Sequence, residues 1–526
     1  MNPSQNIAAL EPSVCLIVPP SAFLLDERVF ISLGLLKVAA SLEARNYKVN
    51  LLDLSGIENY LVPLADYVQY CKDIAIGITT TTPQLPAVIQ IAMTIRKIRP
   101  DLKLILGGPH VTLVSSARKF ERTRGITSGR AHHAAEQLEG IFDVLCSGDG
   151  ELAVFEALKQ DCGKLVDGDD PKGGFFMTDQ MFTDSPLPAR HLVDMNSYHY
   201  KIEGANATSL IAQLGCPFNC GFCGGRNSKS LRLIRNRSVK SILEEIEGLY
   251  VDRGYTGFMF YDDELNVSKS LVELLNGLSD MQSRLAVDFR LRGFIKSELF
   301  TEQQAAAMYR AGFRWLLCGF EAANPRMLEN INKMATLEDN DRCVAMAKKH
   351  GLKIKALMSV GHPGESEKSI GDITGWLIRN AIDDFDCTVI TTYPGTPYYD
   401  MAARHPTEPY VWTYTQPKTG DRLHAYEVDY TACADYYKGD PQGGYRSFVY
   451  TDHLRAEEIV KLRNNVEESV RSKLGIRFNP GAVARRYEHS MGQGLPDFIH
   501  RVSDYSSREP KSNVAQDGAS ATHTPL

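Results

Sequence analysis

The first 185 residues alternate short apolar runs with amphipathic segments. The apolar runs are rich in β-branched residues, which is typical of buried strands. The predicted strands are 14–20, 48–54, 73–83, 102–112 and 142–151. Segments 31–45 and 86–100 carry apolar residues at helical spacing between them. This alternation predicts an α/β fold with a Rossmann-like, doubly wound parallel sheet.

A similar alternation resumes after residue 205 and continues to about residue 400. The predicted strands of this second region are 209–214, 256–266, 287–294, 312–321, 352–366 and 386–400. A Tyr-, Pro- and Gly-rich stretch follows at 401–452, and an amphipathic helix is predicted over 453–475. From about residue 506 the chain loses apolar periodicity, which predicts a disordered tail.

Three cysteines stand in the stretch GCPFNCGFCGG, directly after the predicted strand 209–214. Cys216, Cys220 and Cys223 have the spacing C-x-x-x-C-x-x-C. Thiolates are soft ligands that suit iron–sulfur clusters and zinc. A zinc site needs a second ligand pair, and none follows in this sequence. The motif therefore favours a cubane cluster with three protein ligands and one iron open to a small molecule.

Composition narrows the class of protein further. The chain has 526 residues, 43% of them hydrophobic, and a net charge of −6, so no global basic field indicates nucleic-acid binding. Eleven cysteines in a long chain fit reduced thiols better than a disulfide framework. The first residues lack a basic region followed by an apolar core, so we expect no secretory leader, and no apolar run is long enough to span a membrane. These features predict a cytoplasmic protein of two or three domains.

Small or polar residues follow three strands of the first predicted sheet. They are Thr79–Thr82, Gly107–Gly108 and Gly148–Gly150. Doubly wound sheets bind ligands at the carboxyl ends of their strands, so these residues are candidates for a ligand-binding rim. The alternative is that the glycines only form turns. The fingerprint G-x-G-x-x-G is absent, which weighs against a dinucleotide, and His132–His133 in the polar segment 116–140 are expected to face solvent.

Residues 12–405 resemble the cobalamin-dependent radical S-adenosylmethionine (SAM) enzymes. The resemblance rests on the early Pro19-Pro20, the GGPHVT and CSGDGE turns, and the cysteine motif that follows them. It implies a cobalamin-binding Rossmann-like domain, a partial (β/α)6 TIM-like radical SAM barrel and a mostly helical C-terminal cap. The implied divisions are 1–185 for the cobalamin domain, 186–204 for a linker, 205–405 for the barrel, 406–505 for the cap and 506–526 for the tail.

The resemblance also implies the cofactors and the residues that hold them. The cofactors are a 4Fe-4S cluster on the three cysteines, SAM, and cobalamin as methylcobalamin. The implied cobalamin residues are Pro19, Thr80, Thr81, Thr82, Gly107, Gly108, His110, Gly148, Asp149, Gly150 and Glu151. The loop 51–59 has Asp53 and Gly56 but lacks the histidine that binds cobalt from below in some cobalamin proteins. A histidine from this loop is thus excluded as a cobalt ligand.

Further residues are assigned to SAM by the same resemblance. They are Phe222, Gly224, Asp263, Glu264, Arg290, Arg292, Glu321, Gly361 and Pro363. Arg290 or Arg292 suits the methionine carboxylate, because a guanidinium matches that group with two hydrogen bonds. The alternative for each charged residue is an ion pair internal to the barrel. Tyr393, after the sixth strand, is the one candidate for a catalytic side chain, with packing against the next domain as the alternative.

The resemblance implies a methyltransferase that acts on an unactivated carbon of a small metabolite or lipid-like intermediate through a 5′-deoxyadenosyl radical. An isomerase, cyclase or ring-contracting enzyme that uses the same cofactors without net methylation is the first alternative. Others are a barrel whose first domain no longer binds cobalamin, and a non-catalytic iron–sulfur or zinc scaffold. The expected partners are a small-molecule substrate and a low-potential electron donor such as flavodoxin or ferredoxin, without nucleic acid.

Overall fold

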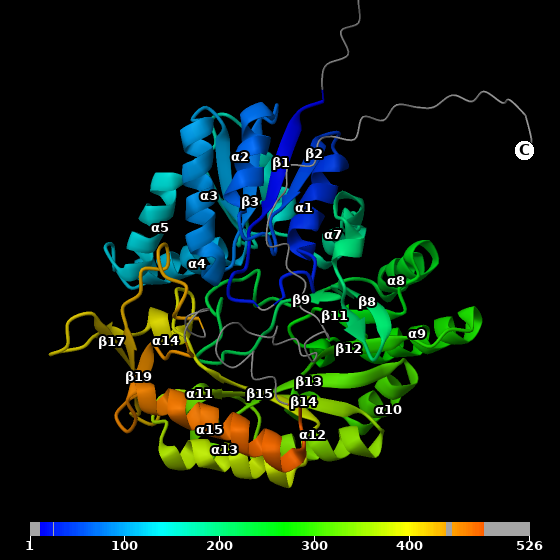
Figure 1. Ribbon diagram of the computed structural model, residues 1–526, viewed down its shortest axis with the longest axis vertical. Helices are drawn as coiled ribbons and strands as arrows, with labels where there is room; N and C mark the ends of the chain where they lie inside the picture. Colours follow the sequence, from blue (N-terminus) through cyan, green and yellow to red (C-terminus); the bar gives the residue numbers. More distant parts are fainter. Residues whose placement is uncertain (1–10, 25, 438–443, 478–526) are drawn as a thin grey trace, which may run out of the picture.

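The computed structural model describes residues 11–24, 26–437 and 444–477, and it places two α/β layers one above the other (Figure 1). The upper layer is a six-stranded parallel sheet in the order β2-β1-β3-β4-β5-β6. Its strands are β1 (Ser13–Val18), β2 (Lys48–Asp53), β3 (Ala75–Thr79), β4 (Lys103–Gly107), β5 (Val144–Gly148) and β6 (Leu165–Gly168). The doubly wound fold is confirmed, and β6 was not predicted.

Helices cover both faces of this sheet because its strands are apolar on both sides. Val14 and Leu16 of β1 pack on one face, whereas Cys15 and Ile17 pack on the other. The helices are α1 (Leu33–Glu43), α2 (Leu61–Tyr70), α3 (Leu85–Ile98), α4 (Pro109–Thr123), α5 (Arg130–Ile141) and α6 (Gly150–Ala157), and the short helix α7 (Asp179–Asp184) follows after β6. His132 is buried in α5 and its Nδ1 lies 2.8 Å from Glu121, so the expectation that it faces solvent was wrong.

The lower layer is a curled half-barrel of seven strands in the order β15-β14-β13-β12-β11-β8-β7. All its pairs are parallel except β7 with β8. The strands are β7 (Lys201–Ile202), β8 (Ala205–Leu210), β11 (Gly257–Phe260), β12 (Arg290–Ile295), β13 (Phe313–Glu321), β14 (Lys353–Val360) and β15 (Asp384–Val389). The partial (β/α)6 barrel is thereby confirmed.

The helices of the half-barrel lie on its outer face. They are α8 (Val239–Arg253), α9 (Leu271–Leu285), α10 (Glu302–Arg310), α12 (Leu337–Lys349) and α13 (Glu367–Arg379). The short helix α11 (Pro325–Ile331) follows β13 and packs against the loop that contains Cys220. Phe258 and Phe260 of β11 join the core beneath these helices, whereas Met259 between them joins a separate inner cluster with Leu317 and Tyr200. This period of two places alternate side chains on the concave wall of the half-barrel.

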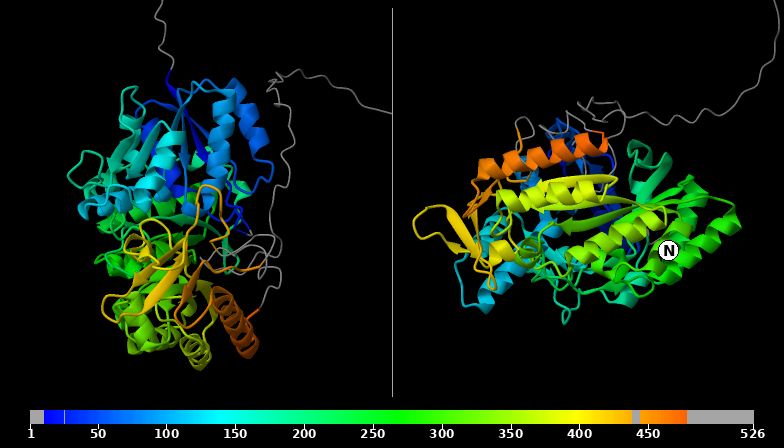
Figure 2. Two further views of the ribbon diagram at one scale, coloured as in Figure 1. Left: turned by 90° about the vertical axis from the view of Figure 1, so that its left-hand side faces the viewer. Right: turned by 90° about the horizontal axis from the view of Figure 1, so that it is seen from below.

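The chain after the barrel forms a small antiparallel sheet and one long helix. The sheet has the order β16-β17-β18-β19 and contains β16 (Ala403–Arg404), β17 (Val411–Thr415), β18 (Arg422–Tyr426) and β19 (Val449–Thr451). Helix α15 (Ala456–Leu474) confirms the predicted helix and lies beside α13 (Figure 2). The described part of the cap is therefore mixed, and the predicted disordered tail at 506–526 lies outside the described residues.

Helix α15 covers the open edge of the half-barrel at β15. Arg463 donates to the carbonyl oxygen of Cys387 at 2.6 Å, and Arg471 donates to that of Phe385 at 2.7 Å. Glu467 accepts from the amide of Cys387 at 3.1 Å. Side chains of the helix thus bind backbone groups that an edge strand leaves without a neighbouring strand.

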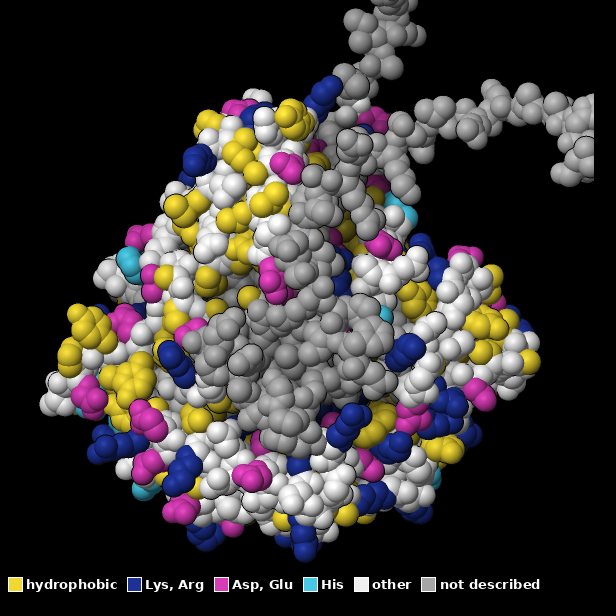
Figure 3. All heavy atoms as spheres, viewed as in Figure 1, with side chains coloured by type: hydrophobic (Ala, Val, Ile, Leu, Met, Phe, Trp, Pro, Cys, Tyr) yellow, Lys and Arg dark blue, Asp and Glu magenta, His cyan; other side chains and the backbone are white. Residues whose placement is uncertain are grey.

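Two surface features bear on possible partners. In the described residues, no helix is both long enough and apolar enough to cross a membrane. On the face shown in Figure 3, basic and acidic side chains are interspersed around the lower layer. This face has no single-sign field of the kind that a nucleic-acid surface presents.

Candidate active site

One loop carries the three cysteines, between the hairpin strands β9 (Gln213–Leu214) and β10 (Arg235–Asn236). Arg226 is buried within this loop and donates to three of its carbonyl oxygens: Cys216 at 3.0 Å, Phe218 at 2.7 Å and Gly224 at 3.0 Å. The amide of Cys223 donates to the carbonyl oxygen of Cys220 at 3.1 Å. A single guanidinium therefore joins the beginning of the loop to its end.

The electrostatics of the loop suit a ligand that stabilises thiolates. Burial raises the pKa of all three thiols, to about 12 for Cys223. The charges of Arg226, near Cys223, and of Lys333, near Cys220, oppose this rise. Within the described residues, no three His, Cys, Asp or Glu side chains form a site for a single metal ion. An iron–sulfur cluster is larger than an ion, and a set of three thiols fits its known chemistry.

The acidic segment after β11 separates into residues with different roles. Asp262 is buried and accepts hydrogen bonds from the amides of Ala212 and Gln213, so its carboxylate fixes the entry to the cysteine loop. Burial raises its pKa to about 7. Asp263 is exposed, on the opposite side of the chain. The two adjacent carboxylates therefore differ in environment, as neighbouring residues of an extended segment do when they point to opposite sides.

Glu264 is the acid in this segment with an unused buried oxygen. Its Oε2 has no hydrogen-bond partner among the described residues, and burial raises the pKa of the carboxyl to about 7. Lys333 and Lys296 are the nearest cations and oppose that rise. A buried carboxylate oxygen without a donor fits a ligand that brings an ammonium group, as methionine does.

The structure does not bring Arg290 and Arg292 to this end of the barrel. Both lie in the first half of β12, and the guanidinium of Arg292 stacks 5.5 Å from the ring of Trp315. Lys296, which sequence reasoning missed, directly follows the carboxyl end of β12. It is buried, pairs with Glu298 at 2.5 Å and lies 4.1 Å from the ring centroid of Phe218 in the cysteine loop. The signal was present, because Lys296 is the second residue after the predicted strand 287–294.

A buried chain of polar groups connects the ends of β13 and β14. Glu321 pairs with Lys333 at 3.3 Å and accepts from Ser359 at 2.8 Å. Ser359 lies 2.8 Å from Nε2 of His362, whose Nδ1 lies 3.3 Å from the hydroxyl of Tyr398. Burial lowers the pKa of His362 to about 3, so this histidine is neutral at physiological pH. The chain of bonds fixes the strand ends beside the cysteine loop.

The turn after β14 lies next to Phe222 of the cysteine loop. The rings of Phe222 and His362 are 5.5 Å apart in an edge-to-face arrangement. Gly361 has a φ of +89°, and the carbonyl oxygen of Pro363 accepts from Asn330 at 2.7 Å. The structure thus brings Phe222, Gly361, Glu321 and the cysteines to one end of the barrel, as the resemblance implies.

Glu365, in the same turn, gives stability a defined pH dependence. It is buried and accepts from Ser369 and from the amide of Gly361, and burial raises its pKa to about 7. In the unfolded chain the pKa of a glutamate is about 4.3. Between that pH and pH 7 the folded protein binds a proton at Glu365 that the unfolded chain has lost, so the contribution of this group to the free energy of unfolding falls as the pH rises. We expect Glu365→Gln to gain thermal stability relative to wild type between pH 5 and pH 8. Calorimetry at both pH values measures this, and a constant difference would contradict it.

The two layers meet where the cysteine loop faces helix α4. A Cβ placed on Gly224 would lie 3.0 Å from Leu113 of α4 and 3.2 Å from the ring of Tyr393, and a Cβ on Gly395 would lie 2.9 Å from Leu113. The amide of Gly225 donates to the carbonyl oxygen of Gly395 at 2.8 Å. Tyr393 is half-buried at this junction, between the cysteine loop and the upper layer.

The rim of the upper sheet faces this junction. Gly108 has a φ of +93°, and a Cβ there would lie 2.6 Å from Thr79 Oγ1 and 2.7 Å from the amide nitrogen of Thr80. The amide of Thr80 donates to the carbonyl oxygen of Gly107 at 3.0 Å, and the amide of His110 donates to that of Thr80 at 3.0 Å. The ends of β3 and β4 are therefore held together by backbone, with no room for a side chain on Gly108.

His110 has a hydrogen-bonding role in this rim. Its imidazole is buried, Nδ1 lies 3.0 Å from the hydroxyl of Thr82, and burial lowers its pKa to about 4. Thr81 caps the turn by donating to Gln84, which in turn donates to the carbonyl oxygen of Pro19 at 3.3 Å. The threonines after β3 and the Pro-Pro turn after β1 thus form one connected edge.

The turn after β5 joins the upper layer to the β9–β10 hairpin. Asp149 accepts from the amide of Met177 at 2.8 Å and pairs with Arg235, so its carboxylate is occupied by a structural role. Gly148 has a φ of +77°, and Gly150 packs against α1 with its Cβ position 3.0 Å from Val38. Burial raises the pKa of Glu151.

Asp53 in the loop 51–59 also has structural partners. It pairs with Arg28 at 2.9 Å and accepts from the hydroxyl of Tyr198 at 2.7 Å. Arg28 also donates to the carbonyl oxygen of Ser55 at 2.9 Å. The loop that lacks a histidine is therefore fixed to the segments before and after the upper layer.

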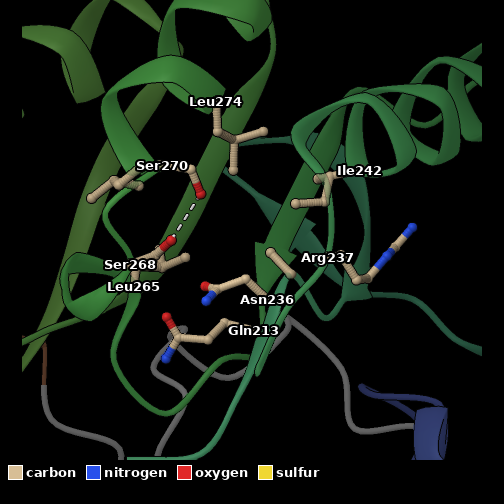
Figure 4. Close-up of a pocket in the computed structure, with 10 residues that line it drawn as sticks. Gln213, Asn236, Arg237, Ile242, Leu265, Ser268, Ser270 and Leu274 are labelled. Atoms are coloured by element: carbon tan, nitrogen blue, oxygen red, sulfur yellow. Dashed lines mark hydrogen bonds between the residues drawn. The ribbon is translucent and has the colours of Figure 1, made fainter. Parts of the chain in front are cut away.

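A small cavity lies behind the cysteine loop and outside the site (Figure 4). The residues that line it include Gln213, Asn236 and Ser268, and none of the three cysteines is among them. The buried oxygens Gln213 Oε1 and Asn236 Oδ1 have no hydrogen-bond partner among the described residues. Two such acceptors suit a bound water that supports the base of the loop.

Comparison with known proteins agrees with this arrangement in both layers. Residues 210–377 match the Radical SAM superfamily, and residues 27–152 match the B12 binding domain. The chain has the two domains of the cobalamin-dependent radical SAM enzymes. The radical SAM match covers β11 to β14 and the cysteine loop, and the B12 match covers the rim formed by the ends of β3, β4 and β5.

Several proteins similar to this chain are named methyltransferases. An uncharacterized methyltransferase PH0819 of Pyrococcus horikoshii is 25% identical over 394 residues, 74% of this chain and 83% of that protein. Bacteriochlorophyllide d C-12(1)-methyltransferase of Chlorobaculum tepidum is 27% identical over 210 residues, 39% of this chain and 44% of that protein. The radical SAM methyltransferase TsrM from Kitasatospora setae, solved with cobalamin and a [4Fe-4S] cluster, shares the fold with a TM-score of 0.59, 16% identity and 94% coverage of both chains.

The residues of this cobalamin-dependent radical SAM enzyme fit its three cofactors. Three thiols and two buried cations suit a cluster that keeps one iron open, and the unused Glu264 oxygen suits the ammonium of SAM. The ends of β3 and β4 pack closely at Gly108, where the chain is bare backbone, and bare backbone suits the approach of a large planar ligand. Cys216, Cys220 and Cys223 would hold the cluster, and the rim would hold the corrinoid.

Proposed function

We propose that this protein is a cobalamin-dependent radical SAM methyltransferase that adds a methyl group to an unactivated carbon of a small metabolite or lipid-like intermediate. The observation that carries the proposal is the junction at Leu113. There, a residue next to the corrinoid rim packs between Gly224 of the cysteine loop and Gly395. The contact places the rim of the upper sheet beside the cysteine loop, so a substrate bound next to it would reach both cofactor sites.

The cofactors carry the difficult chemistry of the proposed reaction. When bound, the cluster with SAM supplies a 5′-deoxyadenosyl radical, and the corrinoid supplies the methyl group. The protein's own part is to bind, orient and exclude water. Arg226 holds the shape of the cysteine loop, Glu264 accepts the ammonium of SAM, and Gly361 lets the backbone after β14 approach a flat base.

Tyr393 limits access of water to the junction. Its ring packs at Gly224, its neighbours come from both layers, and burial raises its pKa above the ordinary tyrosine value. The phenol is therefore neutral at physiological pH and can donate a hydrogen bond without supplying charge. We assign it to the wall of the substrate site.

The proposal includes an external one-electron donor of low potential, such as flavodoxin or ferredoxin. Its support is the outer side of the cysteine loop, where Pro217 and Asn219 are exposed on either side of Phe218. An electron donor that docks here would contact Pro217 and Asn219, which are the direct sequence neighbours of Cys216 and Cys220. A cytoplasmic location is also proposed, because all eleven cysteines are free thiols in the structure.

An anaerobic assay tests the function. Protein reconstituted with iron, sulfide and cobalamin is incubated with SAM and a low-potential reductant. We expect bound corrinoid in the visible spectrum, together with 5′-deoxyadenosine and S-adenosylhomocysteine among the products. 5′-Deoxyadenosine without S-adenosylhomocysteine would indicate a reaction without net methylation, and the absence of both products would overturn the radical assignment.

A further inference from the structure

Lys333 is directed into the protein by the end of helix α11. Asn332 ends the helix with a φ of +59°, and the amide of Lys333 donates back to the carbonyl oxygen of Leu328 at 2.9 Å. This Schellman-type ending turns the chain sharply after the helix. The side chain of Lys333 is only 5% exposed, which is rare for a lysine and requires compensating charge.

The same helix end binds the cysteine loop on both sides of Cys220. The amide of Gly221 donates to the carbonyl oxygen of Ile331 at 2.7 Å, and Asn332 donates to that of Asn219 at 2.8 Å. Cys220 also packs against Leu328 in a small apolar cluster. These contacts fix the chain just before Lys333 against the residues on either side of Cys220.

The carboxylate that faces Lys333 is held in a strained position. Glu321 has a φ of +65°, a region that non-glycine residues rarely adopt, at a break in the register between β13 and β14. Gly319 leaves the necessary room, because a Cβ there would lie 2.5 Å from Glu321 Oε1 and 3.2 Å from Lys333 Nζ. Glu321 thus adopts an unfavourable backbone conformation that keeps this ion pair beside the cysteine loop.

Glu321 divides its two carboxylate oxygens between Lys333 and Ser359. Its Oε1 lies 3.3 Å from the ammonium, and its Oε2 accepts from Ser359 at 2.8 Å. The charge of Lys333 also acts on Cys220 and on Glu264, both of which are buried nearby. The lysine is thus the positive centre of a set that contains two carboxylates and a thiol.

We propose that Lys333 is a positioning residue whose buried charge raises the reduction potential of the cluster on the Cys220 side. The inference rests on the proposed function only in assigning the cluster to the three cysteines. A reduced cluster carries one more negative charge than the oxidised one, so a fixed cation in a low-dielectric setting favours reduction. Glu321 opposes this effect, and the pair together sets the potential that the electron donor must match.

The test measures the midpoint potential of the reconstituted cluster by electron paramagnetic resonance, without SAM. In Lys333→Met we expect the ratio of reduced to oxidised cluster at a given potential to fall about tenfold, which corresponds to about 59 mV towards negative values. Glu321→Gln should move the potential in the opposite direction. The double variant Lys333→Met with Glu321→Gln should lie close to wild type, because it removes both charges.

Controls separate charge from structural damage. Lys355→Met removes another fully buried lysine of the half-barrel, paired with Asp384 at 3.0 Å in the first half of β14, and should leave the potential unchanged. Lys333→Arg keeps the charge and should stay near wild type. If Lys333→Met does not retain the cluster, the inference is tested by Glu321→Gln alone. A positive shift of its midpoint potential supports the inference, and a negative shift contradicts it.

Two results would overturn the inference, and they are distinguishable from failure of the proposed function. With iron content equal to wild type, an unchanged potential in Lys333→Met would remove the role of its charge. A negative shift in Glu321→Gln would have the same consequence. If the wild-type protein binds no cluster under reconstitution, the proposed function fails, and this inference fails with it.

Discussion

Replacing Cys220 with alanine is expected to abolish cluster binding and with it the cleavage of SAM. The cysteine is the buried member of the three, and its loop is bound to helix α11 through Asn219 and Gly221 on either side of it. Changes outside the ligand shell of a metal site already cost about 10–100-fold, so loss of a ligand should reduce 5′-deoxyadenosine formation by more than about 100-fold. Iron analysis and product chromatography measure both effects.

Cys387→Ala is the matched control for this prediction. Cys387 is a fully buried thiol of the same half-barrel, on β15, and its side chain belongs to the core beneath the helices. It should keep wild-type iron content and lose only stability. If Cys220→Ala keeps normal iron and activity, the three cysteines are not the ligands.

The second large effect is expected at the rim of the upper sheet, in Gly108→Ala. The substitution places a Cβ 2.6–2.7 Å from Thr79 and Thr80 and forces a left-handed backbone on alanine. Strain of this kind costs about 1–3 kcal/mol, and the overlap adds a similar amount, so the domain should lose about 3 kcal/mol of unfolding free energy. Because the ends of β3 and β4 must separate, we also expect loss of bound corrinoid.

Gly125→Ala isolates the backbone contribution. Gly125 lies in the same layer with a φ of +72°, but nothing lies within 4 Å of its Cβ position. It should lose stability through strain alone and retain corrinoid like the wild type. Denaturant unfolding and the visible spectrum of the loaded protein measure the two properties. Equal corrinoid loss in both variants would show that the rim at Gly108 does not contact the ligand.

The sequence was a good guide to the fold because each layer repeats a strong local pattern. Alternating β-branched runs and amphipathic helices predicted the presence and order of β1 to β5 and of the six parallel strands of the barrel. Several predicted ranges run well past the observed strand ends, as 386–400 does for β15 (Asp384–Val389), because they include the turn that follows the strand. The short strand β6 and the sheet β16–β19 were missed. β6 has only four residues, and β16 to β19 are short segments within a stretch rich in tyrosine, proline and glycine. Short segments of this kind carry a weak strand signal, and pairing with other strands decides their structure.

The site residues that belong to a short sequence motif could be predicted, whereas the residues that packing brings to the site could not. The cysteine loop and Glu321 were found from short signatures, and both lie at the carboxyl end of the barrel. Arg290 and Arg292 were favoured for their charge, yet they lie several residues before that end, where Lys296 stands instead. Lys333 carried no signal in sequence, because only the turn after α11 directs it inward.

Helix α15 has a consequence for how the barrel can be inherited or exchanged between proteins. The radical SAM match ends at residue 377, before β15, yet the backbone of β15 is completed by Arg463, Glu467 and Arg471. A fragment that stops near residue 405 would present a bare strand edge to solvent and to other copies. The structural unit of the barrel therefore extends through α15, well past the end of the radical SAM match at residue 377.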